Sequence, residues 1–588
     1  MKSIYNITKC WRKIALLMVV AIQMSSCQDF LHTTPVDFAT PTAYYNSQPA
    51  LTSALVGIYS PLLQNDTYGY AIPIWQEDVT DEGYFTTNGN TVSASNDVAV
   101  NLQSYTSTVP TNFWRNCYVG IERANLLIAN IGNAQGVDTS FVKAVLSEAK
   151  FLRGYYHFML VQNFGDVPLK ITPTRDATQT NVPRTPSKDV YAQIIKDMTE
   201  AEAGLPTYQN ATYSNSTSRI TKTAAEAILA RVCLYMAGNP INDNTKYADA
   251  QFWANKVISS GLHSLYSMTD TVANVKNLRG QMLAYPASTA SNPFYPAYKN
   301  NGYAQLFLNM ATNVYSPRES MWEIDANSVS NTIYNMNTNV GCQTGISDAN
   351  DAVTGGCVPY TWIHQYLYDL YASGDLRRDW AISPYGITGA TGVRYFYTTK
   401  NSAAGKPDVL NRSVGKWRRE YEPVPAGWSA KPKWNTQFNF PVIRYSDVLL
   451  MLCEAIVMTT SGSTGSCTDA TALDAINQVR RRAFGLNPTT ASATYDLTSV
   501  TLDEIQKERA RELCFEGVRK ADLIRWGIYL QRMQEVLTLD NNSYPVANRI
   551  FAVVSPQNTV TGGTKVLLWP IPSSEMLVNT AATQNPGY

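Results

Sequence analysis

A run of carboxylates and guanidinium groups near the C-terminus is the first part of the chain that could do chemistry. Its charged residues lie three or four positions apart, as neighbours on a helix do: Glu508, Arg511, Glu512, Glu516, Arg519, Asp522 and Arg525. Two carboxylates about 5 Å apart could serve a retaining glycosidase, and a wider pair an inverting one. The interleaved arginines would lower the carboxylate pKa values, whereas a general acid needs a raised pKa. We therefore expect a structural ion-pair network here, and another at Arg444, Asp447 and Glu454.

Other catalytic and metal-binding patterns are missing from the sequence. There is no Gly-x-Ser-x-Gly elbow, no His-Glu-x-x-His helix and no phosphate-binding glycine loop. Histidine is rare, and His157 falls in a helical pattern that predicts a structural role. Cys342 and Cys357 flank a Gly/Asn/Asp-rich stretch and could close a loop in an oxidising compartment. The sequence does not decide whether they form a disulfide. The residues imply no catalytic group, metal or other cofactor, although binding of an ion such as calcium also stays open.

Aromatic residues favour a neutral polar ligand. The chain has 36 Tyr and 12 Trp, and only 16% of its residues are charged. A sugar ring can pack its C–H face on an indole or phenol ring, and each buried aromatic covers roughly 150–250 Å². Desolvation of the sugar hydroxyls offsets much of this gain. We therefore expect an affinity in the micromolar to millimolar range, about 4–8 kcal/mol.

The overall charge argues against nucleic acid as a partner. Lysine and arginine total 47 against 46 acidic residues, and the sequence has no long run of one sign. A nucleic-acid binder would show a basic stripe or excess. The length of 588 residues, 45% of them hydrophobic, permits a large buried core.

The N-terminus has the pattern of an export signal. Four basic residues precede an apolar run at 14–22: Lys2, Lys9, Arg12 and Lys13. The run is too short to span a bilayer, which needs about 20 apolar residues, but it suits a signal peptide. Met24-Ser25-Ser26-Cys27 resembles the lipobox of bacterial lipoproteins. We predict a signal peptide over 1–26 and a lipid anchor on Cys27. The alternative is a secretory signal cleaved near an incidental cysteine.

Helical periodicity dominates the next part of the chain. Apolar residues recur every three or four positions over 145–160, 191–205, 225–236 and 250–258. Short connections with Gly and Pro end each stretch, which suggests stacked helical hairpins like tetratricopeptide repeats. The segment 265–440 is instead rich in Tyr, Asn, Gly, Ser and Thr, and its aromatics argue against disorder. Helices are predicted again over 445–458, 470–484 and 502–536.

Several motifs in the same order resemble the SusD/RagB family, the nutrient-binding lipoproteins of Bacteroidetes. The matching stretches are Cys27-Gln28-Asp29-Phe30-Leu31, Ala149-Lys150-Phe151-Leu152-Arg153, Phe164-Gly165-Asp166-Val167-Pro168-Leu169, Pro441–Leu450, Ala475–Arg480, Glu508–Trp526, Leu568-Trp569-Pro570-Ile571-Pro572 and Gln584-Asn585-Pro586-Gly587-Tyr588. The resemblance implies a mainly α fold, in which a tetratricopeptide-like helical-hairpin scaffold supports a loop-rich ligand-binding insertion (265–440). It divides the chain into an N-terminal region (27–264) and a C-terminal region (265–588).

The resemblance also implies a function without catalysis. It predicts an outer-membrane lipoprotein on the cell surface that captures a glycan and delivers it to a SusC-like TonB-dependent barrel. Alternatives are a peptide or glycoprotein-derived ligand and, less favoured, a glycoside hydrolase or a scaffold that binds only protein. The candidate ligand-binding residues form two groups, and packing is the alternative role for each of them. The first choice is Trp75, Glu77, Asp78, Asp81 and Tyr84, and the second is Tyr334, Tyr360 and Trp362.

Overall fold

The structure is a computed structural model of the chain. It describes residues 11, 44–85, 109–210, 213, 217–270, 301–312, 314–326, 338–349, 356–389, 394–397, 400–401, 406–407, 409, 412–423, 436–543 and 564–588. The predicted signal peptide (apart from Trp11), the predicted lipid anchor at Cys27 and the candidate Tyr334 lie outside the described residues.

Helices provide most of the regular structure, which confirms the predicted mainly α fold. They are α3 (Gln48–Tyr59), α5 (Val109–Asn130), α6 (Thr139–Phe164), α7 (Ser187–Glu202), α8 (Lys222–Ala237), α9 (Lys246–Ser259), α10 (Gly302–Ala311), α11 (Gln365–Asp369), α12 (Arg378–Ala381), α13 (Tyr445–Thr460), α14 (Ala470–Ala483), α15 (Leu502–Leu513), α16 (Arg519–Arg525), α17 (Tyr529–Ser543) and α20 (Ser573–Val578). None of the described helices is long and apolar enough to cross a membrane.

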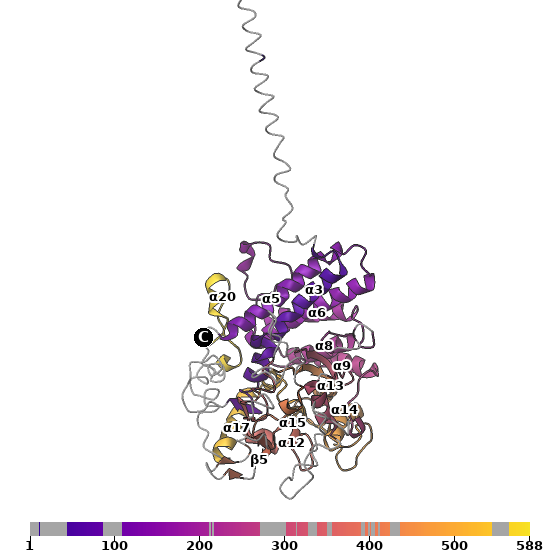
Figure 1. Cartoon of the computed structure of the whole chain (residues 1–588), viewed down its shortest axis with the longest axis vertical. Helices are drawn as coiled ribbons and strands as arrows, with labels where there is room; N and C mark the ends of the chain where they lie inside the picture. Colours follow the sequence, from indigo (N-terminus) through magenta and orange to yellow (C-terminus); the bar gives the residue numbers. More distant parts are fainter. Residues whose placement is uncertain are drawn as a thin grey trace, which may run out of the picture.

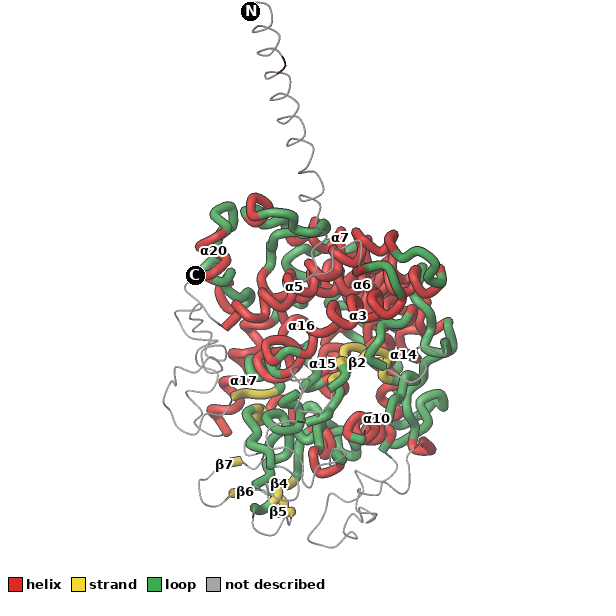
Figure 2. The backbone as a smooth tube through the Cα atoms, turned by 45° about the horizontal axis from the view of Figure 1, so that its top comes forward, coloured by secondary structure: helices red, strands yellow, loops and turns green. Residues whose placement is uncertain are grey.

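Strands are short and pair only two at a time in the described residues. They are β1 (Gly83–Phe85), β2 (Ser320–Ile324), β3 (Thr361–Ile363), β4 (Tyr385–Ile387), β5 (Arg394–Phe396), β6 (Lys400–Asn401), β7 (Lys406–Pro407) and β8 (Phe440–Arg444). The antiparallel pairs are β1–β3, β2–β8, β4–β5 and β6–β7. Long helices occupy one half of the molecule, and the other half holds most of the loops and small strands (Figures 1 and 2).

The N-terminal helices pack against one another in chain order. α5 packs on α6, α6 on α7, α7 on α8 and α8 on α9, and α13 from the C-terminal region then covers α9 (Figure 1). Successive helices that lie side by side are what short connections produce. This arrangement is the tetratricopeptide-like scaffold that the sequence predicts.

Local sequence fixes the ends of these helices. Asp138 caps α6 by accepting a hydrogen bond from the N–H of Phe141 at 2.8 Å. At the other end, Gly165 takes a positive φ of 71°, a conformation that glycine adopts without strain. α8 is buried on every face except at Lys222, since two layers of helices enclose it.

The long helix predicted over 502–536 is wrong. The structure breaks this stretch into α15, α16 and α17. Phe515 and Gly517 have φ values of 63° and 74°, and Gly527 has 73°, so the right-handed helix cannot continue through them. The charged residues keep their helical spacing across the breaks, which is why periodicity alone joined the three helices.

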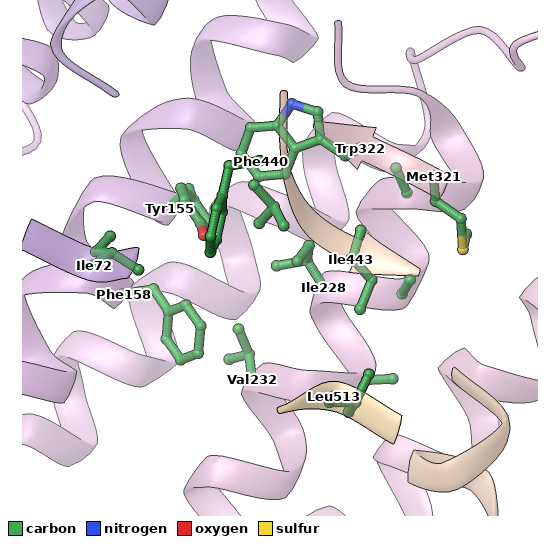
Figure 3. Packing of buried hydrophobic residues seen from close by; sticks show 14 of the residues in the cluster. Ile72, Tyr155, Phe158, Ile228, Val232, Met321, Trp322, Phe440, Ile443 and Leu513 are labelled. Carbon is green, nitrogen blue, oxygen red and sulfur yellow. The ribbon is translucent and has the colours of Figure 1, made fainter. Parts of the chain in front are cut away.

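The main hydrophobic core joins the two regions of the chain. Strand β8 pairs with β2 and leads directly into α13. Trp322 of β2 is fully buried and packs edge-on to Tyr155 of α6, with ring centroids 4.8 Å apart. Figure 3 shows Phe440 and Ile443 of β8 beside Trp322 in the same cluster. The core therefore needs residues from both ends of the sequence.

The segment 265–440 has little regular structure where it is described. Its longest described helix is α10, with ten residues. The other elements are short, and loops connect them (Figure 2). This agrees with the loop-rich insertion that the sequence predicts.

Candidate ligand-binding site

The carboxylates of the first-choice group are buried. Asp81 is fully buried, and its two oxygens accept hydrogen bonds from the guanidinium of Arg519, both at 2.7 Å. Glu77 is fully buried and accepts a hydrogen bond from the N–H of Gly517. Asp78 is 2% exposed. At these three positions the structure favours a packing role over ligand contact, because their oxygens face protein.

Glu77 forms a carboxyl pair with Glu82, which the sequence analysis did not single out. Burial raises the pKa of Glu77 to about 7, and burial followed by the charge of Glu77 raises that of Glu82 as well. Two carboxyl groups in hydrogen-bond contact hold a proton more tightly than separate ones do. Glu82 also accepts a hydrogen bond from the N–H of Phe515 at 3.1 Å. The pair therefore fastens the 77–82 segment to the turn before α16.

The two predicted groups of ligand residues meet at one place. Tyr84 on β1 lies opposite Trp362 on β3, although the two are far apart in sequence. Tyr84 is fully buried and packs on the ring of His364, with centroids 5.0 Å apart. Trp362 is partly exposed, and its indole N–H donates to the carbonyl of Pro359 at 3.2 Å. Burial makes Tyr84 a support for the indole rather than a surface residue.

Trp362 has an aromatic neighbour that the sequence analysis missed. Tyr366 is partly exposed, and both rings pack on one small apolar cluster that includes Tyr84 and Val79. The guanidinium of Arg532 lies 4.6 Å from the centre of the Tyr366 ring. We call Trp362, Tyr366 and Arg532 the aromatic rim. The spacing of Tyr366 four residues after Trp362 is the signal that could have found it.

The remaining candidates are Tyr360, Trp75 and Tyr334. Tyr360 is partly exposed, packs against the main core and donates its N–H to the carbonyl of Gln343 at 2.7 Å. Trp75 ends the short helix η4 (Ala71–Trp75), and its side chain lies outside the described residues. Tyr334 also lies outside the described residues.

The C-terminal charged run forms the predicted structural network. Arg377 contacts Glu508 at 2.6 Å, and Arg444 contacts Glu516 at 2.7 Å. Burial alone would raise the pKa of Glu512, but neighbouring guanidinium groups outweigh it and lower this pKa to about 2. Those groups belong to Arg482, Arg444 and Arg377. Carboxylates held ionised in this way are poor general acids.

The second predicted set belongs to the same network. Asp447 contacts Arg509 at 2.6 Å, and Arg509 contacts Asp522 at 2.8 Å. Glu454 forms an ion pair with Arg525. The ion-pair prediction is therefore confirmed for both sets.

Two further groups have the local structure that fits a packing role. His157 is buried in α6 with its Nδ1 2.9 Å from the carbonyl oxygen of Arg153, and burial lowers its pKa to about 4. Cys342 and Cys357 are separate buried thiols, and Sγ of Cys357 donates to the carbonyl of Cys342 at 2.7 Å.

Comparison with known proteins assigns the fold to a family. The family described as "SusD family" matches residues 318–588, and the one described as "Starch-binding associating with outer membrane" matches residues 29–234. The chain belongs to the SusD/RagB family.

Individual members of this family are similar along most of the chain. SusD-like protein P25 of Formosa agariphila is 23% identical over 542 residues, which cover 87% of this chain and 89% of that protein. A SusD homologue from Bacteroides thetaiotaomicron has a TM-score of 0.76 at 24% identity and covers 95% of this chain and 99% of its own. A laminarin-binding SusD-like protein has a TM-score of 0.65 at 21% identity, covering 92% and 100%. At these identities the solved structures establish the fold.

Proposed function

We propose that this chain binds a nutrient glycan at the cell surface and delivers it uncleaved to a SusC-like TonB-dependent barrel. The observation that carries the proposal is the family match over both regions of the chain, one of them to a family described as starch-binding. The laminarin-binding relative supports a glycan as the ligand class. The predicted lipid on Cys27 would hold the chain at the outer membrane.

The aromatic rim supports the same ligand class. An indole and a phenol ring that are partly exposed on one apolar cluster offer flat surfaces to a sugar ring, and Arg532 offers donors to its hydroxyls. Trp362 thus stays in the proposed site, and Tyr360, Trp75 and Tyr334 remain candidates. Glu77, Asp78, Asp81 and Tyr84 are assigned to its support, since they are buried.

A role without catalysis fits the carboxylates. The ion-pair network keeps Glu508 and Glu512 ionised, and the pKa values of both lie well below their usual range. Glu77 and Glu82 have raised pKa values, as a general acid needs, but they are buried against protein. A glycosidase would need one carboxyl group of each kind at the substrate.

Calorimetric titration of the mature chain with laminarin and starch oligosaccharides tests the proposal. We expect saturable binding with the glycan recovered intact, and a loss of about tenfold or more in affinity for Trp362→Ala, equal to about 1.4 kcal/mol. Phe252→Ala is the matched control, because this aromatic is 56% exposed on α9. Equal affinity for both variants would remove the rim from the site. If only peptides bind, the ligand class is peptide and not glycan. If the glycan is recovered in shortened form, the protein is an enzyme.

Delivery and anchoring need separate tests. Co-purification of the intact lipoprotein with its barrel from outer membranes is expected, and it should persist when glycan is absent. Cys27→Ala should release the chain from the membrane fraction. A Cys27→Ala protein that stays membrane-bound would contradict the lipid anchor.

A further inference from the structure

A cavity in the helical half of the molecule is lined by Lys520, which has no ion-pair partner among the described residues, and by Arg231, whose Nε has no hydrogen-bond partner there. Its inner chamber has a volume of about 50 Å³ and is lined by residues of α5, α6, α8 and α16 and by the turn before α16. An outer chamber of about 410 Å³ adjoins it and shares Gln162, Tyr235, Ala521 and Ile524 as walls. The outer volume lies in the range of small-molecule sites, roughly 300–1,000 Å³.

Lys520 is one of the residues that line the inner chamber, and it is 5% exposed. Across the described ranges Lys520 has no hydrogen bond and no ion pair, and its Nζ lies 6.0 Å from the centre of the Tyr529 ring. Burial lowers the pKa of Lys520 to about 7. A buried ammonium group without a counter-charge is costly, so the site favours either the neutral amine or a bound anion.

Arg231 supplies the second unpartnered donor. Its Nη1 donates to the carbonyl of Val442 at 2.8 Å, and its Nη2 group forms an ion pair with Asp447. Its Nε is buried and has no hydrogen-bond partner in the described part of the chain. Buried N–H groups almost always have a partner, so an orphan that lines a chamber points to an absent ligand or to water.

Among the charged residues that line the inner chamber, Lys520 alone has no ion pair in the described part of the chain. Arg231 is matched by Asp447. Glu516, the carboxylate in the chamber wall, is already matched by Lys416 and Arg444, both at 2.7 Å. Lys520 is therefore the surplus cation, and a single negative charge would neutralise it. A monoanion fits this balance better than a dianion such as hydrogen phosphate.

We propose that the two chambers bind a small carboxylate, with its carboxylate group against Lys520 and Arg231 in the inner chamber and its body in the outer one. The outer walls offer neutral polar groups for such a body, including Gln162, Asn239 and Gln584. Their charged residues are Asp166, Arg184 and Arg525. A sugar acid, one ring carrying one carboxylate, is the class that uses both chambers. This site is separate from the aromatic rim, and it does not rest on the proposed glycan function.

Calorimetry of the intact mature chain with four probes in chloride-free buffer tests the site. Acetate supplies the charged group, glucuronate the charged group and a ring, and acetamide and glucose are their neutral counterparts. We expect acetate and glucuronate to bind, glucuronate more tightly, and the two neutral probes to fail in this cavity. Failure of both carboxylates to bind would overturn the proposal.

Variants place the binding in the cavity. Lys520→Met keeps the side-chain length and removes the charge, so it should lower glucuronate affinity by tenfold or more. Lys507→Met is the matched control on the surface, where Lys507 pairs with Asp503 at 2.7 Å. Trp362→Ala should leave glucuronate binding unchanged, which separates this site from the glycan site. Undiminished binding by Lys520→Met would overturn the proposal.

A measurement on the unaltered protein keeps the test independent of any variant. Glucuronate stays ionised from about pH 6 to 9, whereas the amine of Lys520 loses its proton within this range. Binding that uses the ammonium group should weaken as the pH rises, because the protein must first take up a proton. An affinity that stays constant over this range would contradict the assignment of Lys520.

Discussion

At the scale of single residues, Asp81 and Arg519 show how charged side chains can be buried when they pair with each other. Both side chains are buried, and the two hydrogen bonds between them are 2.7 Å long. Removing one charge of such a pair leaves the other uncompensated, at a typical cost of about 3–5 kcal/mol. Asp81→Asn should lower the free energy of unfolding by this amount, measured by urea denaturation.

The control for Asp81→Asn is Asp503→Asn. Asp503 pairs with Lys507 at 2.7 Å, but the side chains are 59% and 37% exposed. Exposed pairs contribute about 0–1 kcal/mol, so this variant should unfold almost like the original chain. Equal losses for both variants would contradict the structural role of Asp81. Lost glycan binding without lost stability would return Asp81 to the ligand site.

The pair of Glu77 and Glu82 makes stability depend on pH. The pKa of Glu77 rises from 4.5 to about 7 on folding because of burial. Between these values the folded chain binds a proton that the unfolded chain has released, so stability falls as the pH rises through this window. Glu77→Gln should reduce the fall. Free energies of unfolding of both proteins, measured at several pH values between about 5 and 8, check this expectation. Identical slopes of stability against pH for the variant and the original chain would contradict it.

The positions of these carboxylates could not be predicted from their own segment. Residues 75–84 combine aromatic and acidic side chains, a composition that suits a polar surface equally well. What buries Asp81 is Arg519, 438 residues further along the chain. For the same reason, Trp362 and Tyr84 could be named as candidates, but their pairing across β1 and β3 could not be foreseen.

At the scale of helices and strands, close contact between α5 and α6 depends on glycine. A Cβ atom on Gly120 would lie 2.2 Å from the ring of Tyr156, which is fully buried. The ring cannot move away, because its hydroxyl donates to the carbonyl of Ile58 at 2.5 Å. Gly120→Ala should therefore destabilise the fold by about 1–3 kcal/mol, measured by chemical denaturation.

A second glycine gives the opposite expectation and serves as its control. Gly57 lies in α3, and nothing is within 4 Å of its added Cβ. Gly57→Ala should stabilise the protein by about 0.5–1 kcal/mol, since alanine loses less backbone freedom on folding. If both variants change stability in the same direction, the contact at Gly120 does not limit the helix packing.

Periodicity predicted the helices better than their connections. α6, α7, α8 and α9 were expected because apolar residues recur on one face and Gly or Pro ends each helix. The breaks after α15 and α16 were not expected. The first break depends on the positive φ angles of Phe515 and Gly517, and the second on that of Gly527. A phenylalanine gives no local sign of such a conformation. The loops of 265–440 were predicted only as loops, since their paths depend on distant partners.

At the scale of the whole molecule, one core crosses the predicted boundary at 264/265. The division into 27–264 and 265–588 stays a prediction, but β8 and α13 fill the space beside α8 and α9. A chain ending at 264 would leave these faces in water. We expect it to lack a cooperative unfolding transition by calorimetry, and co-expression with 265–588 should restore one. A sharp transition for the shorter piece alone would contradict this.

The burial of the ion-pair network also affects how the stability of the protein depends on salt concentration. Dissolved ions weaken attractions between charges at a surface, with a screening length of about 10 Å at 0.1 M salt. Arg444, Glu512 and Glu319 are sealed from solvent, so dissolved ions cannot come between them. Dilute and concentrated salt solutions should therefore leave these buried ion pairs within the C-terminal region equally strong. A protein exposed to the outside medium would keep its shape while the charges on its surface lose their influence.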